Sequence, residues 1–432
     1  MALGGGTFVT QNKILPGSYI NVISAARASA ELSDRGIVAI PMALKWGKEG
    51  EVIPVSKGDF QKDCFNLFGY DYTHDEMKPL REIFMNAVKV FVYRLGTGGK
   101  ATCTFADAKC AGTRGNDIDI VIAVNVDDAT KSDVKTFVDT TLVDSQTVTT
   151  SEKTTALKDN DWVVWKDNVA IAATAGTPLT GGENATVSGA NHSTALAALE
   201  SVAFNVLVSD TDDLTTKGIY FNYTKRMRDE LGIKFQCVLH KYATADYEGA
   251  VSVENNTGTE CVYWVAGVLA GCAINKSLTN KLYNGEYTID TVYTQSQLEA
   301  AIQAGKFIFH KVGDNVRVLK DINTLVTTTA DKGDIFKDNQ TIRVVDQIAN
   351  DIATLFNSKY LGVVPNDAAG RISLWADIVK HHEQLEEIRA IEEFEDSNMT
   401  VTQGNTKQSV VVNDTITVVN SMVQLYMTCI VQ

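Results

Sequence analysis

Histidine and cysteine are scarce in this chain, which contains six histidines and seven cysteines among 432 residues. The cysteines are odd in number and have no short, regular spacing, so they predict reduced, buried thiols of a protein made in the cytoplasm. Neither residue type forms a group with the spacing of a metal site or of a nucleophile beside its base. The sequence therefore offers few arrangements for catalysis, although scarcity alone does not exclude an enzyme.

Positive charge is also scarce, with 39 lysine and arginine residues against 53 aspartate and glutamate residues and a formal net charge of −14. Binding to phosphates requires clustered basic residues, so we expect neither nucleic acid nor an anionic membrane surface as a partner. The longest apolar stretch, residues 261–274, is too short to cross a bilayer and predicts a buried helix. The N-terminus has no basic segment followed by an apolar run, so no signal peptide is expected.

Two glycine-rich segments resemble phosphate-binding loops only in part. Around residues 96–101, Arg94 stands where a glycine is required and Ala101 stands where a serine or threonine is required. Residues 176–182 have the right outer spacing but lack the lysine and the hydroxyl. Both segments predict turns between modules, and no nucleotide or other cofactor is expected.

Adjacent histidines, His381 and His382, stand on a predicted helix. Neighbouring helical side chains point about 100° apart, so these two cannot bind one ion together. His382 and Glu386 have helical spacing, but no second histidine completes a zinc motif. A solvated helix face, with His382 near the apolar stripe, is the preferred interpretation. The sequence therefore predicts no metal site, and no catalytic residue stands in a recognisable context.

The predicted fold class is α+β with several domains, because strand–helix alternation, threonine-rich β patterns and amphipathic helices follow one another along the chain. It comprises an α/β core with an inserted all-β module, a C-terminal domain of two helices plus β-strands, and extended arms at both ends. The predicted parts are an N-terminal arm (1–24), an α/β core (25–95 and 183–330), an inserted β-rich domain (96–182), a C-terminal domain (331–408) and a C-terminal β arm (409–432).

Both ends of the chain predict strands that need a partner. The first arm has short β-prone runs around residues 7–10 and 19–23, and the last has them at 410–419 and 422–431. Apolar strands with unpaired backbone groups aggregate unless they are covered. If each arm pairs with a different neighbour, the molecule becomes a link in a helical lattice. The alternative, in which both strands fold back onto their own domain, remains open.

Five short motifs, in this order, resemble the contractile tail sheath proteins of bacteriophages and of phage-tail-like bacteriocins. The chain length and the inserted β module resemble the sheaths of phages and defective prophages of Gram-positive bacteria. One departure is Glu183-Asn184, where the family pattern has Asp-Gly in a turn. The motifs are PGSYIN (16–21), LTGG (179–182), YWVAG (263–267), DINTL (321–325) and MVQLYM (422–427).

The resemblance implies a structural subunit that is not an enzyme and needs no cofactor. Subunits of this family form stacked hexameric rings, and so a helical sheath, around a tail tube. Contraction of the sheath drives the tube through the target cell envelope. The implied partners are other copies of the chain, the tail tube protein, and the baseplate and tail terminator proteins, without nucleic acid or membrane insertion. The particle would be assembled in the bacterial cytoplasm and released by lysis as a virion tail or a phage-tail-like particle.

The resemblance also implies roles for parts of the chain. The C-terminal domain would face the tube, with Arg343, Gln347 and Asn350 as tube-facing residues, and the inserted domain would lie outermost. Glycines 4–6 and the residues near Gly404 would be hinges of the arms. The residues expected to exchange strands between subunits are Phe8, Val9, Tyr19, Ile20, Val22, Val411, Ile416, Val418, Val423, Leu425, Met427 and Val431.

Two other functions remain open from the sequence. One is a cytoplasmic α/β enzyme whose site residues converge only in three dimensions. The other is a related assembly protein of a different contractile injection system, which would share the mechanism.

Overall fold

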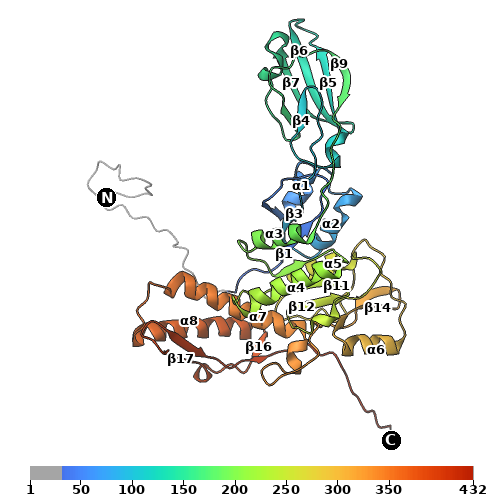
Figure 1. Cartoon of the computed structure of the whole chain (residues 1–432). Helices are drawn as coiled ribbons and strands as arrows, with labels where there is room; N and C mark the ends of the chain where they lie inside the picture. The colour runs from blue at the N-terminus through green and yellow to red at the C-terminus, as the bar shows by residue number, and fades with distance from the viewer. Residues whose placement is uncertain (1–31, 432) are drawn as a thin grey trace, which may run out of the picture. The chain divides into compact units, whose positions relative to one another are not determined.

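The computed structural model describes residues 32–431 and is drawn in Figure 1. It divides into two compact units, which are described one at a time. The larger unit contains residues 34–349 and 418–431, and the smaller unit contains residues 350–417 together with residues 32 and 33.

The larger unit is built on a seven-stranded sheet in the order β13-β12-β11-β10-β1-β3-β2. All neighbouring strands are parallel except β2, which is antiparallel to β3. The mostly parallel sheet expected from the strand–helix alternation is therefore confirmed. The strands are β1 (Ile37–Met42), β2 (Val52–Ser56), β3 (Lys89–Arg94), β10 (Val206–Val208), β11 (Gln236–His240), β12 (Ala250–Val253) and β13 (Lys306–Phe307).

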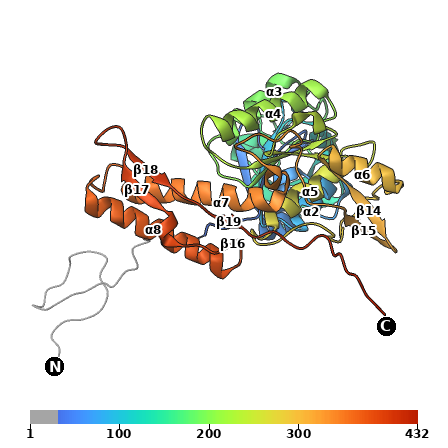
Figure 2. The same ribbon diagram turned by 90° about the horizontal axis from the view of Figure 1, so that it is seen from below.

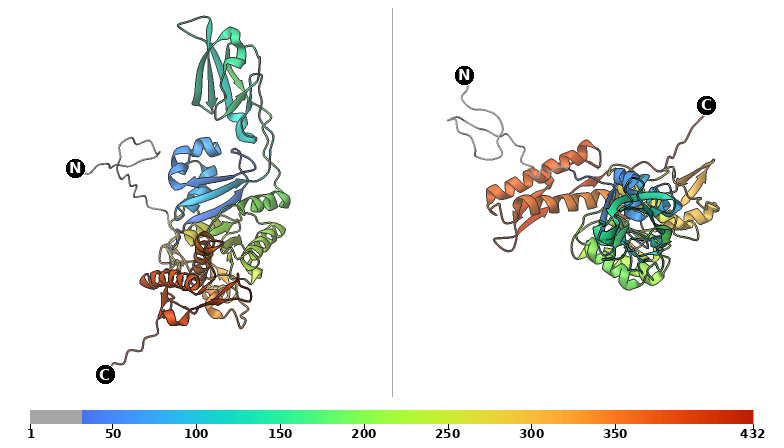
Figure 3. Two further views of the ribbon diagram at one scale, coloured as in Figure 1. Left: turned by 90° about the vertical axis from the view of Figure 1, so that its left-hand side faces the viewer. Right: turned by 90° about the horizontal axis from the view of Figure 1, so that it is seen from above.

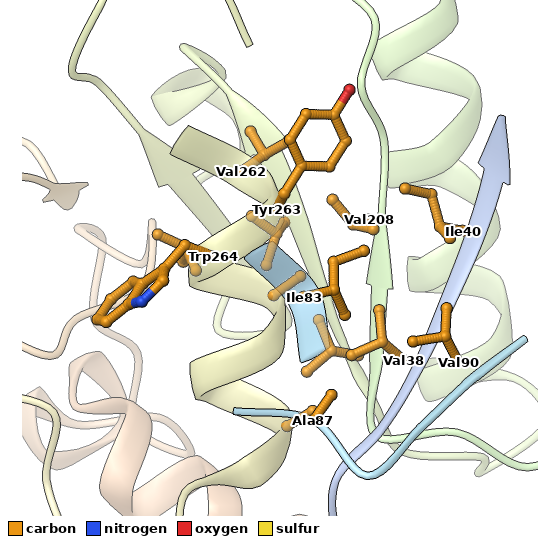
Figure 4. Packing of buried hydrophobic residues seen from close by; sticks show 14 of the residues in the cluster. Val38, Ile40, Ile83, Ala87, Val90, Val208, Val262, Tyr263 and Trp264 are labelled. Carbon is orange, nitrogen blue, oxygen red and sulfur yellow. The ribbon is translucent and has the colours of Figure 1, made fainter. Parts of the chain in front are cut away.

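Helices cover both faces of this sheet, because successive side chains of each strand are apolar and point to opposite faces. Val38 and Ile40 of β1 pack with α1 (Lys57–Phe68), α2 (Lys78–Phe84) and α5 (Cys261–Gly271). Figure 4 shows this packing at close range.

Ala39 of β1 points to the other face and packs with α3 (Gly189–Leu199) and α4 (Leu214–Asp229). These two helices lie side by side in Figure 2. The unit also contains α6 (Gln295–Gln303) and the hairpin of β14 (Phe309–Val312) and β15 (Asn315–Val318), which was expected across Gly313.

The start of α3 differs from the sequence expectation, which placed the N-cap at Ser193. The helix begins five residues earlier, after Ser188, whose backbone N–H donates to Asn191 Oδ1 at 2.9 Å. This bond satisfies one of the backbone N–H groups that have no acceptor within the helix at its N-terminus. Ser193 lies inside the helix, and its hydroxyl donates to the carbonyl of Gly189 at 3.1 Å.

The inserted domain contains a four-stranded antiparallel sheet, β7-β6-β5-β9, and a two-stranded sheet, β4-β8 (Figure 3). Their inward side chains form a separate apolar cluster that includes Ile118, Ile120 and Val134. The all-β character of this segment is therefore confirmed. The strands are β4 (Ala106–Ala108), β5 (Ile118–Val124), β6 (Lys131–Val138), β7 (Thr141–Thr149), β8 (Val163–Trp165) and β9 (Thr174–Pro178).

Backbone pairing closes the inserted domain where it leaves the core. Gly99 and Glu183 form an antiparallel bridge, with N–O distances of 2.9 and 3.0 Å. Trp46 of the core stacks on Trp162 of the insertion, with ring centroids 4.9 Å apart. Buried Arg94 donates to the carbonyl of Ala111 at 2.8 Å. These contacts join the apolar core of the larger sheet to that of the inserted domain.

The smaller unit contains the end of α7 (Asn339–Leu355), α8 (Ala368–Glu387) and the antiparallel hairpin of β17 (Thr400–Gln403) and β18 (Val410–Asn413). β16 (Ile391–Glu392) follows α8 and pairs with β19 (Thr417–Val418), the last strand among the described residues. The second amphipathic helix was expected to extend to Phe394 but ends at Glu387. Arg389 and Glu393 have φ of 58° and 53°, which a right-handed helix cannot contain. The α+β class with several domains is confirmed.

Candidate assembly interface

The hairpin β17–β18 contains the first half of the expected C-terminal arm. Val401 pairs with Val412, and Thr402 pairs with Val411. The predicted strand 410–419 is therefore divided, and its first part pairs within its own chain. Within the described residues this sheet has two strands only, so each strand has one edge without a neighbouring strand. Such an edge can accept a strand from another chain.

The side chains of β18 alternate between the core and solvent. Val410 and Val412 pack against a buried cluster formed by Leu374 and Ile378 of α8 with Met399. Val411, expected to exchange strands between subunits, is 44% exposed on the opposite face of the hairpin. One face of the hairpin is thus fixed to α8, while the other is available for contact.

Two adjacent histidines of α8 are buried in the smaller unit, which corrects the expectation of a solvated helix face. His381 Nε2 lies 3.0 Å from Asp351 Oδ2, and His382 Nε2 lies 2.8 Å from Asp414 Oδ2. Charged partners of this kind allow polar side chains to be buried. Among residues 32–431, no group of three or more potential ligands is placed to hold a metal ion.

In the larger unit, Gln340 of α7 binds residues 419 and 421, just before the exposed end of the chain. Its Nε2 donates to the carbonyl of Val419 at 3.0 Å, and its Oε1 accepts from the N–H of Ser421 at 3.0 Å. Thr341 Oγ1 donates to Asn420 Oδ1 at 3.2 Å. The side-chain amide of Gln340 thus bonds to two backbone groups, the Val419 carbonyl and the Ser421 N–H, as a neighbouring strand would.

Beyond Ser421 the C-terminal tail (residues 422–431) has no strand assignment, although its alternating pattern predicted one. A strand requires a hydrogen-bonded partner, and none lies beside this segment within the described chain. All ten residues are exposed, and exposure of Val423, Leu425, Met427 and Val431 ranges from 52% to 90%. An apolar segment this exposed indicates a contact surface for another molecule.

The remaining expected strand-exchange residues divide into two groups. Ile416 and Val418 are half-buried, and Val418 belongs to β19. Phe8, Val9, Tyr19, Ile20 and Val22, and the glycine hinge before them, lie outside the described residues.

The expected tube-facing residues are not all on a surface. Arg343 is 2% exposed, and its guanidinium donates to Asp321 at 2.6 Å. Gln347 is 3% exposed, and its side chain accepts a bond from Arg35. The expectation that Arg343 and Gln347 face the tube is therefore corrected. Both side chains lie in the interior, where Arg343 contacts Asp321 and Gln347 contacts Arg35. Asn350 is half-buried.

Sequence reasoning did not identify Gln340 or Asp414 as important for the arm. Gln340 is a polar residue at the start of an amphipathic helix, and Asp414 lies inside the predicted strand 410–419, so neither carries a distinctive pattern. Only their contacts reveal their roles.

The carboxyl edge of the parallel sheet was the place to look for an enzyme site, because α/β proteins bind ligands there. His240 Nδ1 lies 2.6 Å from Asp212, and Tyr263 donates to Asp210 at 3.3 Å. Burial raises the pKa of Asp210 to about 6. These contacts join neighbouring elements of the core, and no nucleophile is hydrogen-bonded to this histidine within the described residues.

Four family descriptions match successive segments of the chain. They are the tail sheath protein Gp18 domain III N-terminal region (residues 35–95), the phage tail sheath protein beta-sandwich domain (96–184), the phage tail sheath protein central domain (185–324) and the phage tail sheath C-terminal domain (331–432). None of the helices within residues 32–431 combines the length and apolar composition needed to cross a bilayer.

Similarities to individual proteins agree with these family matches. The chain is 34% identical over 390 residues to the phage-like element PBSX protein XkdK of Bacillus subtilis, covering 81% of each chain. The crystal structure of a sheath tail protein from Desulfitobacterium hafniense is 37% identical, with a TM-score of 0.81, over 90% of this chain and 93% of that one.

The contracted helical sheath of the anti-feeding prophage shares the fold, with 12% identity and a TM-score of 0.58 over 96% of this chain and 99% of that one. The family expected from the five motifs is confirmed, and the chain belongs to the phage tail sheath protein family.

Proposed function

We propose that this chain is the structural subunit of a contractile tail sheath. It polymerises as stacked hexameric rings around a tail tube and contracts to drive the tube through the target cell envelope. The observation that carries this proposal is the exposed apolar C-terminal tail, residues 422–431, in a chain whose hairpin β17–β18 has open edges. The tail of one copy adds a strand to a sheet of another copy and gains the backbone hydrogen bonds that it lacks alone. The N-terminal arm, residues 1–24, makes a second link of the same kind.

The proposed partners are further copies of the chain, the tail tube protein, and the baseplate and tail terminator proteins. The domains divide the work as the family resemblance implies: residues 331–408 lie toward the tube, residues 25–95 and 183–330 form the core, and residues 96–182 lie outermost. The sheath belongs to a virion tail or phage-tail-like particle that is assembled in the bacterial cytoplasm. The work is mechanical and requires neither a catalytic residue nor a cofactor.

Removing an arm tests the proposal. A chain lacking residues 422–432 and a chain lacking residues 1–20 should each remain soluble and folded, with the circular dichroism of the full chain, but form no sheaths under the electron microscope. Normal sheaths from either truncated chain would contradict the arm mechanism.

A matched pair of substitutions sharpens this test. Apolar side chains occupy every second position of the tail, so Leu425→Asp places a charge on the face that would be buried in a strand pair. Gln424→Asp places the same charge on the opposite face. Leu425→Asp should abolish sheath formation, whereas Gln424→Asp should permit it. Equal effects of the two substitutions would contradict a defined strand register.

A further inference from the structure

Gln340, in the first turn of α7, is 3% exposed, yet its side chain bonds to the backbone of segment 419–421, which is half-buried or exposed. Its Oε1 accepts from the N–H of Ser421 and its Nε2 donates to the carbonyl of Val419, each at 3.0 Å. One planar amide can reach a carbonyl and the N–H two residues later only when both groups point to the same side. Backbone groups are arranged in this way in an extended strand, so residues 419–421 are held extended.

The same pattern of bonds is made by a residue of a parallel strand to its neighbouring strand. Such a residue uses its own N–H and carbonyl to bond on either side of the residue opposite. The Gln340 amide takes that place opposite Asn420, although it belongs to a side chain. Two further bonds fix Asn420 itself: Thr341 Oγ1 donates to Asn420 Oδ1 at 3.2 Å, and Asn420 Nδ2 donates to Asp338 Oδ2 at 3.5 Å. Residues at the start of α7 and just before it therefore hold three consecutive residues of the chain.

The Gln340 contact, its two bonds to residues 419 and 421, lies between a paired strand and the exposed tail. Before it, β19 ends at Val418 and pairs with β16. After it, residues 422–431 are all exposed and have no strand partner among the described residues. Without the contact, the segment lacking a neighbour would begin at residue 419 and gain three residues, or up to about 10 Å of extended chain. The contact therefore fixes the point at which the tail starts.

The starting point of the tail also decides which way its side chains face. Apolar side chains occupy every second position, at residues 423, 425, 427, 429 and 431. Successive side chains of a strand point to opposite faces, so a shift of the start by one residue turns all of them to the other face. An extended start also loses less conformational entropy when the tail pairs, which favours association. The contact therefore bears on both the register and the affinity of strand exchange.

We propose that Gln340 is a positioning residue for strand exchange between copies of the chain. Its side chain acts as a strand of one residue, which holds residues 419–421 extended. It thereby fixes where residues 422–431 start and which face carries their apolar side chains. The strand exchange rests on the proposed function, whereas the contact of Gln340 with residues 419 and 421 does not.

Hydrogen exchange of the Ser421 amide in unassembled full-length subunits tests the contact. Gln340→Ala removes the acceptor, so this amide should exchange about tenfold faster than in the unchanged chain. Gln347→Ala, the matched control, removes an equally buried glutamine from the same helix and should leave the rate unchanged. Equal rates in the unchanged chain and in Gln340→Ala would overturn the proposal, whether or not sheaths form.

Insertions between Ser421 and Met422 test the register. One inserted serine turns the apolar side chains of the tail to the other face, and should block the sheaths that electron microscopy detects. Two inserted serines restore the face and should permit sheaths. In Gln340→Ala the start of the tail can shift, so the two insertions should behave alike, whereas Gln347→Ala should keep the difference. Equal effects in the unchanged chain, or a difference that persists in Gln340→Ala, would contradict the proposal.

A second pair of variants leaves α7 unchanged and so avoids a folding defect in the helix. Ser421→Pro, at an exposed position, removes the N–H that donates to Gln340, whereas Ser421→Ala keeps it. The two insertions should behave alike with Ser421→Pro and differ with Ser421→Ala, and the reverse would overturn the proposal. A full chain that forms no sheaths would instead contradict the proposed function, and hydrogen exchange of Ser421 would still test the contact.

Discussion

Arg228 illustrates how strongly a buried charge depends on its partner. It lies in α4, close in sequence to Lys225 and Arg226. In the structure its guanidinium is 3% exposed and donates two parallel bonds to Asp346, at 2.6 and 2.8 Å. The pair joins α4 to α7 within the larger unit.

Replacing Arg228 by methionine should lower the free energy of unfolding by about 3–5 kcal/mol, because Asp346 would remain as a buried, unpaired carboxylate. The double variant Arg228→Met/Asp346→Leu should recover most of this loss. Urea denaturation of the three chains measures the effect. Equal stabilities of the single and double variants would show that Asp346 is not the cause.

Asp210 gives the larger unit a predictable response to pH. Because burial raises its folded-state pKa to about 6, above the ordinary value of about 3.9, the folded chain binds more protons than the unfolded chain between these limits. This group's contribution to stability is therefore greatest below about pH 4 and falls as pH rises to about 6. Asp210→Asn, which can still accept the bond from Tyr263, should stabilise the protein at pH 8 by up to about 3 kcal/mol.

At pH 4 the same substitution should change stability little, since the carboxyl is already protonated there. Urea denaturation at pH 4 and pH 8 provides the comparison. Asp331→Asn, which removes an exposed carboxylate, is the control and should leave the pH dependence unchanged. A gain of equal size at both pH values would contradict the role of burial.

At the scale of elements, α5 is apolar on all sides and lies between the sheet and α2. Two glycines permit the close approach to the end of α2 and the residues after it. A Cβ on Gly267 would lie 2.3 Å from the carbonyl oxygen of Ile83, and a Cβ on Gly271 would lie 2.1 Å from that of Asn86. Neither contact can be relieved by a side-chain rotation, because the obstructing atoms are backbone.

Gly267→Ala should therefore destabilise the protein by about 1–3 kcal/mol, as overpacking forces α2 and α5 apart. Gly333→Ala is the matched control, since a Cβ there would meet nothing within 4 Å. Thermal unfolding of both variants checks the prediction. A stability loss in Gly333→Ala as large as in Gly267→Ala would point to a general effect of losing glycine.

Elements were predictable wherever their patterns are local. The alternation in residues 88–95 identified β3, and the helix expected over residues 213–231 is α4. Asp213 is its N-cap and accepts the Thr216 N–H at 2.7 Å. Helix ends were less accurate, as in α8, whose end is set by positive-φ residues that carry no strong sequence signal. The strand expected at residues 162–172 is short because only Val163–Trp165 finds a partner, β4.

At the scale of the molecule, the inserted domain enters and leaves the core at two residues that are paired with each other. Gly99 and Glu183 are an antiparallel pair, so a two-residue turn can connect them. Replacing residues 100–182 by Asn-Gly should leave the seven-stranded sheet intact. It would, however, expose Trp46, which is buried against Trp162 in the full chain.

The shortened chain carrying Trp46→Ser should be soluble and should unfold cooperatively, as judged by circular dichroism and urea denaturation. The shortened chain with Trp46 retained is the control, and should bind a hydrophobic dye and aggregate because a large apolar surface is uncovered. Loss of the folded core in both versions would show that the insertion is required for folding.

The sequence by itself determined the order of elements, the inserted β domain and the family. These features depend on periodicity, turn residues and short motifs, which are properties of neighbouring residues. The tertiary structure alone decided which side chains are buried and which surfaces remain exposed. It buried Arg343 and Gln347, paired β18 with β17 and left residues 422–431 exposed. The reason is that burial and strand pairing depend on segments that are distant in the sequence, so no local pattern records them.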